Sequence, residues 1–288
     1  MRIYLLITNR CNLNCSICIR GKQYDMDLDY EEFSSVFSSE VYKNMEMVIT
    51  GGEPTLHPKF VDIVHLASKY FKSVLVASNG TTDYYIEDLK NLKNLIFQIS
   101  LDGNLNAHNL IRGEGAFQST MNTLYKFEDN ELNYCVASVV GNSNKENIFE
   151  LVPVLKRLKK MKFWRISYEM PFGNANSQSI MLAEEWNQFV DNILEVVEFR
   201  MLIKKIYFFE IFDKCINNKE KIVTKCFNCG SGKDTIYIYP NLDVYPCTCL
   251  TDFCIGNIKN DSLYNIINGS NNKKFTCYNL DEELPCIS

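Results

Sequence analysis

Residues 7–18 read ITNRCNLNCSIC and place Cys11, Cys15 and Cys18 directly after the first apolar run of the chain. The spacing is Cys-x3-Cys-x2-Cys. A cubane iron–sulfur cluster normally takes four cysteine thiolates, one for each iron, so a loop that supplies three leaves one iron open to another ligand. A structural zinc site is the alternative, and it usually draws on four Cys or His ligands. No further cysteine or histidine follows until His57.

Length and charge narrow the classes of protein to which the chain can belong. With 288 residues and 46% hydrophobic content it can bury one large core and carry a small appendage. A net charge of −5 argues against nucleic-acid or anionic-membrane partners, which would need a basic face. No apolar run approaches the roughly 18 residues of a membrane span. The chain begins directly on an apolar run without a charged-then-apolar leader, so we expect a cytoplasmic protein.

Short apolar runs alternate with helical patterns from residue 2 to about residue 205. The runs predict strands at Arg2–Ile7, Met45–Ile49, Ser73–Ala77, Leu95–Ile99, Tyr134–Val140 and Trp164–Tyr168. The helical patterns lie at Tyr30–Phe37, Lys59–Tyr70, Tyr84–Leu92, Ala116–Glu128, Lys145–Lys160 and Ala183–Leu202. Such alternation indicates parallel strands with right-handed crossovers. We therefore expect an α/β fold with an open, TIM-like (β/α)6 barrel over residues 1–205.

The remaining residues, 206–288, form a small cysteine-rich extension. Thr235–Tyr239 and Asp243–Tyr245 alternate around a Pro-Asn-Leu turn, which predicts a β-hairpin. The chain has 12 cysteines, most of them near residues 11–18 and 226–286. A reducing compartment does not favour a disulfide framework, so clustered thiols indicate metal binding. Cys135 lies inside a strand pattern and is expected to be a buried structural residue.

Chemistry-bearing residues follow the predicted strands, at the edge where parallel α/β folds place their sites. After the second strand comes Gly51-Gly52-Glu53-Pro54, where glycines let a ligand approach the backbone and Glu53 offers an acceptor for an ammonium group. Ser78-Asn79-Gly80 follows the third strand. Ser100-Leu101-Asp102-Gly103 follows the fourth, and His108 to Gly113 comes next. For Asn79 and Asp102, ordinary turn chemistry is the alternative interpretation.

Together these stretches resemble the signatures of the radical S-adenosylmethionine (SAM) enzymes. The resemblance implies that Cys11, Cys15 and Cys18 hold a [4Fe-4S] cluster whose open iron chelates SAM. It implies that Gly51, Gly52 and Glu53 contact the amino group of SAM. Ser78, Asn79 and Ser100 would hold its ribose and carboxylate. Arg112 would bind the carboxylate or instead pair with Asp102, and His108 is expected to be structural.

The tail resembles the SPASM/Twitch extension of peptide-modifying members of that family. In this resemblance Cys226, Cys229 and Cys247 are ligands of an auxiliary iron–sulfur cluster. Cys277 or Cys286 completes the set, or the fourth position is left open for substrate. The later dense cysteine run of full SPASM domains is missing, which favours one auxiliary cluster. The family usually has glycine where Leu242 stands, so Asn241 is expected to supply the left-handed turn residue. A zinc ribbon is the alternative for these cysteines.

The resemblance implies an oxidoreductase that cleaves SAM reductively to a 5′-deoxyadenosyl radical and abstracts a hydrogen atom from a peptide. The outcome would be a crosslink, an epimerisation or an oxidation, and in an epimerisation the Cys249 thiol would return a hydrogen atom. The alternatives are a radical SAM dehydrogenase of a small molecule and a non-catalytic zinc-binding α/β protein. The expected partners are a precursor peptide and a flavodoxin- or ferredoxin-like electron donor. Since the first strand begins at residue 2, we also expect either a separate leader-binding protein or direct recognition of the peptide by the barrel mouth.

Overall fold

The computed structural model describes residues 1–176, 178–195, 206–208, 231–249 and 251–273. Its strands form one 10-stranded sheet in the order β10-β9-β8-β1-β2-β3-β4-β5-β6-β7. Neighbours from β1 through β7 are parallel. Their bounds are β1 Arg2–Thr8, β2 Glu46–Gly51, β3 Ser73–Ser78, β4 Leu95–Ser100, β5 Tyr134–Val140, β6 Met161–Tyr168 and β7 Ile206–Phe208. The α/β barrel class and its strands are thus confirmed, and the short β7 is an addition.

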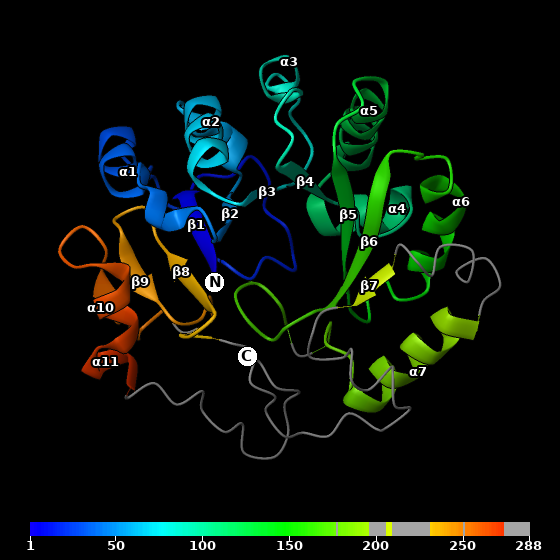
Figure 1. The fold of residues 1–288 in the computed structure, drawn as a ribbon. Coiled ribbons are helices and arrows are strands. Elements are labelled where there is room, and N and C mark those ends of the chain that lie inside the picture. Colours follow the sequence, from blue (N-terminus) through cyan, green and yellow to red (C-terminus); the bar gives the residue numbers. More distant parts are fainter. Residues whose placement is uncertain (177, 196–205, 209–230, 250, 274–288) are drawn as a thin grey trace.

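Helices follow the strands, and those between β1 and β4 and directly before β5 lie along one face of the sheet (Figure 1). Their bounds are α1 Tyr30–Phe37, α2 Phe60–Tyr70, α3 Ile86–Leu89, α4 Leu105–Arg112, α5 Ala116–Asp129, α6 Leu151–Leu155 and α7 Ala183–Glu195. Short 3-10 helices cover Glu40–Tyr42, Pro54–Leu56 and Asn147–Glu150. The helix predicted at Tyr84–Leu92 is confirmed only in its middle turn, α3. Residues 196–202 of the last predicted helix lie outside the described residues.

The helix predicted at Lys145–Lys160 is wrong in length. The chain there forms a 3-10 helix that runs directly into the short α6. Pro153 explains the difference, because proline lacks an N–H and its ring clashes with the carbonyl four residues earlier. It fits only the first turn of an α-helix, and that is where α6 holds it.

Aromatic side chains fasten the helices to the sheet. Phe97 of β4 stacks on Tyr85 with ring centroids 5.2 Å apart and packs against Phe127 of α5 at 5.0 Å. All three rings are buried, and their neighbours Phe60 and Tyr134 extend the cluster. Burial of this kind stabilises by about 1.5–3 kcal/mol per side chain. The helix-facing side of the sheet is therefore apolar, which leaves the carboxyl edge of the strands for polar groups.

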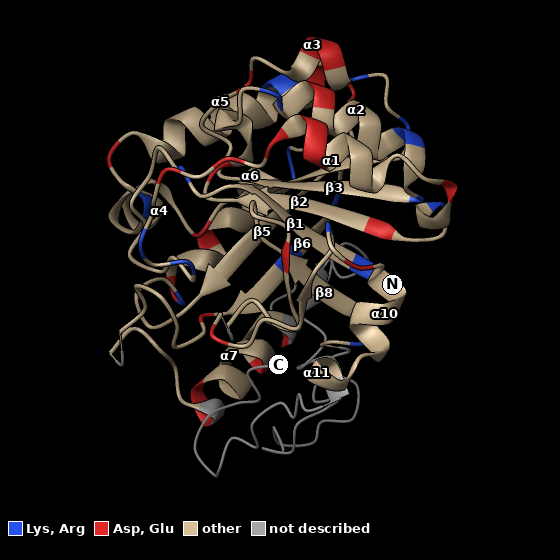
Figure 2. Ribbon diagram, turned by 90° about the vertical axis from the view of Figure 1, so that its left-hand side faces the viewer, with Lys and Arg blue, Asp and Glu red and all other residues tan. Residues whose placement is uncertain are grey.

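Acidic residues gather on the outer helices, as Figure 2 shows for α1 and α3, whose first turns hold Glu31 with Glu32 and Glu87 with Asp88. Within the part of the chain that the structure describes, no helix has both the length and the apolar character needed to cross a membrane.

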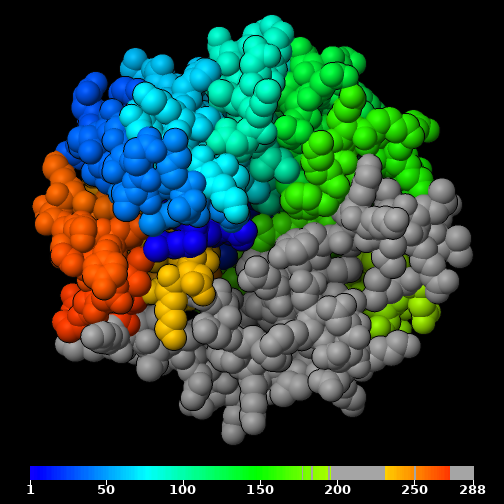
Figure 3. All heavy atoms as spheres, viewed as in Figure 1, coloured from blue at the N-terminus to red at the C-terminus, as the bar shows by residue number. Residues whose placement is uncertain are grey.

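The tail hairpin continues the barrel sheet. β8 (Thr235–Ile238) pairs in parallel with β1, and it pairs antiparallel with β9 (Asp243–Tyr245), which is followed by β10 (Gly256–Asn257). Helices α10 (Leu263–Asn268) and α11 (Ser270–Lys273) complete the described tail. In the space-filling view the tail lies against the first part of the chain (Figure 3), where Lys259 forms an ion pair with Glu32 of α1. The cysteine-rich extension therefore pairs with β1, the strand that leads into the cysteine loop.

The hairpin turn corrects one expectation from the sequence. Leu242, and not Asn241, adopts the left-handed conformation, with φ of 66°. A non-glycine residue there is strained, but Leu242 is fully buried and gains packing that glycine would lack. Asn241 instead accepts a hydrogen bond from the Asp243 N–H at 3.2 Å. The left-handed residue of this turn therefore also fills the core.

Candidate functional site

The cysteine loop follows β1 at the carboxyl edge of the barrel. Cys15 is buried, while Cys11 and Cys18 are partly exposed. Ser16 donates its N–H to the carbonyl of Ile111 in α4 at 2.9 Å, and the Leu13 N–H reaches Cys11 Sγ at 3.5 Å. The loop is thus held by the next functional segment along the sheet.

The chemistry of these three sulfurs fits an iron–sulfur cluster better than one metal ion. Burial, with smaller contributions from Glu53, Cys15 and Cys18, raises the pKa of the Cys11 thiol to about 11. Such thiols become thiolates only beside a strong positive charge. Among the described residues, no group of three or more His, Cys, Asp and Glu side chains could hold a single ion. A cubane cluster spreads its ligands over separate irons, which suits a set of this kind.

The glycine turn after β2 packs backbone to backbone against the cysteine loop. The N–H groups of Gly52 and Glu53 donate to the carbonyls of Thr8 and Arg10, both at 2.8 Å. A Cβ on Gly51 would lie 2.3 Å from the Thr8 carbonyl oxygen, and one on Gly52 would lie 2.2 Å from that of Arg10. The close approach that these glycines allow is therefore an approach to the cysteine loop itself.

Glu53 is fully buried and joins the turns after β2 and β3. Its Oε1 accepts hydrogen bonds from the Thr55 hydroxyl at 2.7 Å and the Ser78 hydroxyl at 2.9 Å. Its Oε2 accepts the Asn79 N–H at 2.7 Å. Burial raises the pKa of this carboxyl, against the lowering effect of these donors. The predicted residues Glu53, Ser78 and Asn79 thus form one hydrogen-bonded group.

Asn79 and Ser100 face the site in different ways. The Asn79 side chain donates to Asn12 Oδ1 at 2.9 Å and lies 4.0 Å from Cys11 Sγ, so it contacts the cysteine loop. Ser100 ends β4 and is partly exposed. Among the described residues, no hydrogen bond of the Ser100 hydroxyl is recorded. Of the predicted SAM contacts, Ser100 is therefore the one whose hydroxyl remains available to a ligand.

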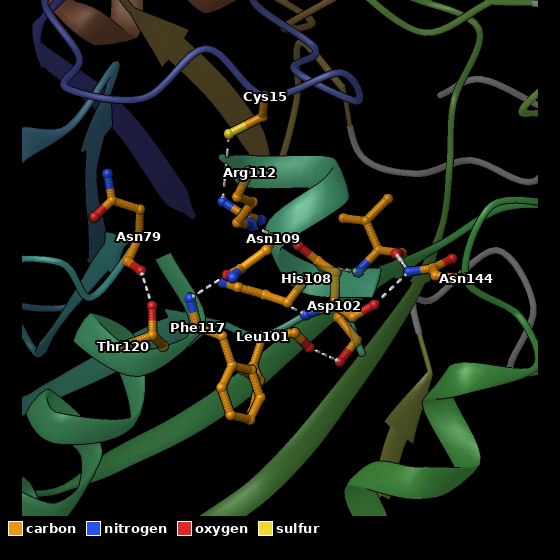
Figure 4. Close-up of polar contacts among 12 residues, drawn as sticks. Cys15, Asn79, Leu101, Asp102, His108, Asn109, Arg112, Phe117, Thr120 and Asn144 are labelled. Atoms are coloured by element: carbon orange, nitrogen blue, oxygen red, sulfur yellow. Dashed lines mark hydrogen bonds and ion pairs between the residues drawn. The ribbon is translucent and has the colours of Figure 1, made fainter. Parts of the chain in front are cut away.

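Arg112 pairs with Asp102, which was one of its two predicted roles (Figure 4). Its Nε donates to Asp102 Oδ2 at 2.5 Å, and its Nη1 donates to Cys15 Sγ at 3.9 Å. His108 is fully buried and accepts the Asp102 N–H on Nδ1 at 3.0 Å. Burial lowers the pKa of His108 to about 4, so the ring is neutral. This is the structural role expected for His108.

The contacts of Gly173 and Asn174 with the cysteine loop were not predicted from the sequence. Asn174, after β6, donates through Nδ2 to the Cys15 carbonyl and through its N–H to the Cys18 carbonyl, both at 2.9 Å. Gly173 adopts φ of 66°, and a Cβ there would lie 2.1 Å from the Cys18 carbonyl oxygen. The Gly173-Asn174 step in the turn that follows β6 was the available signal. These two residues fix the far end of the cysteine loop.

The described part of the tail contains one predicted auxiliary ligand. Cys247 is buried just after β9, and its Sγ accepts the N–H of Cys249 at 3.4 Å. Cys249 is partly exposed. Arg20, two residues past Cys18, donates to the Tyr239 hydroxyl at 2.8 Å, so the two cysteine regions are directly connected. Cys226, Cys229, Cys277 and Cys286 lie outside the described residues.

Two family models match the chain. Residues 5–158, just over half of the chain, match the radical SAM superfamily. Residues 226–287 match SPASM, an iron–sulfur cluster-binding domain. The second match covers every predicted auxiliary ligand, and the first covers the whole cysteine loop.

Two proteins with similar sequences come from Bacillus subtilis (strain 168). The chain is 36% identical over 154 residues to the sporulation killing factor maturation protein SkfB, covering 51% of this chain and 38% of SkfB. It is 29% identical over 282 residues to the antilisterial bacteriocin subtilosin biosynthesis protein AlbA, covering 91% of this chain and 58% of AlbA. The chain thus spans less than two thirds of the length of either relative.

A solved structure agrees in fold. The crystal structure of Streptococcus suis SuiB bound to precursor peptide SuiA matches with a TM-score of 0.80 and 12% identity. The match covers 93% of this chain and 64% of that one. The superfamily match over more than half of the sequence, on a barrel that carries its three cysteines at the carboxyl edge, shows that this chain belongs to the radical SAM superfamily.

Proposed function

We propose that the chain is a radical SAM enzyme that modifies a peptide. In this reaction one electron cleaves SAM, and the resulting 5′-deoxyadenosyl radical removes a hydrogen atom from a side chain or Cα of the substrate. The observation that carries the proposal is the cysteine loop, which presents three thiols and is braced by Gly52, Arg112 and Asn174. When bound, a [4Fe-4S] cluster supplies the electron and one open iron for SAM.

The residues around the loop bind and orient SAM in this proposal. Gly51, Gly52 and Glu53 face its amino group. Glu53 uses Oε2, which accepts the Asn79 N–H, because Oε1 already accepts hydrogen bonds from both the Thr55 and Ser78 hydroxyls. The proposed contacts of the ribose and carboxylate are Ser78, Asn79, Ser100 and Arg112. The hydroxyl of Ser100 supports this assignment, because it forms no hydrogen bond with the described residues and so remains available to SAM.

We propose different roles for the two parts of the chain. Residues 1–205 form the SAM-cleaving barrel and residues 206–288 the auxiliary-cluster extension. Cys226, Cys229 and Cys247 hold that cluster together with Cys277 or Cys286. Cys249 returns a hydrogen atom if the product is an epimer, and its place two residues past Cys247 supports this role.

A peptide is the proposed substrate because two similar sequences carry names of peptide maturation or biosynthesis proteins. The similar fold of SuiB was solved with a precursor peptide. We place the enzyme in the cytoplasm, where a flavodoxin- or ferredoxin-like protein supplies the electron. A separate leader-binding protein completes the proposed set of partners.

Metal analysis after anaerobic reconstitution tests the proposal. Wild-type protein should contain iron and acid-labile sulfide. The Cys11→Ala/Cys15→Ala/Cys18→Ala variant should contain less of both, by the amount that one [4Fe-4S] cluster holds. Cys135→Ala is the matched control, because this buried cysteine lies in β5, outside both proposed ligand sets. Zinc without iron or sulfide in the wild-type protein would refute the proposal.

Mass spectrometry of a peptide co-expressed from a neighbouring gene tests the substrate class. A mass change in the peptide that requires Cys11, Cys15 and Cys18 supports a peptide maturase. An unmodified peptide, with SAM cleavage stimulated by a small molecule from the same gene cluster, would support the dehydrogenase instead.

A further inference from the structure

A buried ion pair lies directly beneath the cysteine loop. Asp102 follows β4, and Arg112 is the last residue of α4. The Asp102 side chain is 0% exposed and that of Arg112 is 11% exposed. A buried charge is costly unless it is paired and serves a purpose. SAM binding alone does not explain why Arg112 needs so rigid an anchor.

Asp102 is held from several sides, so it fixes the guanidinium in turn (Figure 4). Its Oδ1 accepts the Val139 N–H of β5 at 2.8 Å, and its carbonyl accepts Asn144 Nδ2 at 2.7 Å. Its own N–H donates to His108 at 3.0 Å. The carboxylate therefore has a single position available, and the hydrogen bond from Arg112 Nε sets the orientation of the planar guanidinium.

The other side of the guanidinium faces Cys15. Nη1 lies 3.9 Å from Cys15 Sγ, within the range of an N–H···S hydrogen bond. The Ser16 N–H is bonded to the Ile111 carbonyl, so the loop and the end of α4 move together. A fixed positive charge thus accompanies one of the three proposed cluster ligands.

We propose that Arg112 raises the reduction potential of the barrel cluster through its hydrogen bond and charge at Cys15, with Asp102 as the positioning residue. This inference rests on the proposed function. On reduction the cluster takes one electron from a low-potential donor and gains one negative charge, with no bond made or broken. A cation held beside a ligand sulfur stabilises the more negative state. The role is separate from any contact of Arg112 with the SAM carboxylate.

An anaerobic redox titration followed by electron paramagnetic resonance, without SAM, tests the inference. The barrel cluster is identified by the change of its signal in a parallel sample with SAM. Arg112→Gln should decrease the ratio of reduced to oxidised cluster at least tenfold at a given potential, which is about 59 mV for one electron. Arg112→Lys keeps the charge but loses the planar fork, so it should shift the ratio in the same direction by less.

Arg10→Gln is the matched control. Arg10 directly precedes Cys11, but its guanidinium bonds Asp27 and the Leu56 carbonyl. This variant should shift the ratio less than threefold. If Arg112→Gln fails to assemble a cluster, the lysine variant still decides, because wild-type behaviour in it would overturn the inference.

Two further outcomes separate the possible failures. An unchanged potential in both Arg112 variants, with weakened SAM binding, would assign Arg112 to the SAM carboxylate and overturn the inference alone. A wild-type protein that shows no SAM-responsive cluster would overturn the proposed function, and this inference with it.

Discussion

At the scale of the residue, contacts with the cysteine loop decide which side chains are tolerated. Gly51, Gly52 and Gly173 all face carbonyl oxygens of residues 8–18 at distances that a Cβ cannot occupy. The sequence identified Gly51 and Gly52 as special but assigned their closeness to a ligand. The distinction could not be predicted, because it depends on how two turns from different strands meet. The contact of Asn174 with the cysteine loop could not be predicted for the same reason.

Gly52→Ala should destabilise the protein and displace the cysteine loop. The new Cβ would lie 2.2 Å from the Arg10 carbonyl oxygen, and overpacking against backbone costs about 2 kcal/mol. The urea concentration at the midpoint of unfolding and the iron content after reconstitution should both decrease. Gly256→Ala is the control, because its Cβ would meet only the Ile266 side chain, at 3.0 Å or more. Equal effects of the two substitutions would contradict this account.

His108 should make stability depend on acid pH. Its pKa is lowered to about 4 by burial, below the usual value of about 6.5. Its stabilising contribution is therefore complete above pH 6.5 and is lost as the pH falls through 4. The free energy of unfolding should decrease by about 1.4 kcal/mol per pH unit in that window from this group. His108→Gln keeps an acceptor for Asp102 and should flatten the curve; identical slopes would refute the assignment.

At the scale of the element, local patterns predicted the barrel strands correctly but misjudged one helix and one turn. The six barrel strands follow from short apolar runs between helical stripes. The length of the helix around Pro153 was overestimated, because a stripe of apolar residues does not take into account that proline lacks a backbone N–H. The left-handed residue of the hairpin was misplaced because burial of Leu242 outweighs its backbone strain.

The hydrogen bond between Arg20 and Tyr239 should couple the cysteine loop to the tail hairpin. Tyr239→Phe removes only the hydroxyl and should cost about 1 kcal/mol. Hydrogen exchange should then quicken both in residues 18–21 and in β8. Tyr245→Phe is the control, since the Tyr245 ring packs against Tyr239 at 4.7 Å and no hydrogen bond of its hydroxyl is recorded among the described residues. Faster exchange in the tail alone would show that the two regions are not coupled.

At the scale of the whole molecule, the tail and the barrel share one sheet. The pairing of β8 with β1 joins residues 235–238 to residues 2–5 in parallel. The Tyr4 and Tyr237 rings stack at 4.7 Å across this pair. No sequence pattern shows which distant strand a given strand will pair with. The sequence therefore predicted the extension as a separate appendage.

Removal of the tail should therefore damage the barrel. A chain that ends at residue 230 would expose the edge of β1 and the apolar residues that Ile236 and Ile238 cover. It should aggregate or unfold at lower urea than the full chain. The full chain itself should unfold in one transition by circular dichroism. A soluble truncated protein with unchanged stability would contradict the shared-sheet account.

The central claim, that the three-cysteine loop binds and cleaves SAM, is tested most directly by 5′-deoxyadenosine release. Reconstituted protein with dithionite and SAM should release this product, and Cys135→Ala should behave like the wild type. The Cys11→Ala/Cys15→Ala/Cys18→Ala variant should release none while the tail retains its iron. Release at the wild-type rate by that variant would contradict the claim.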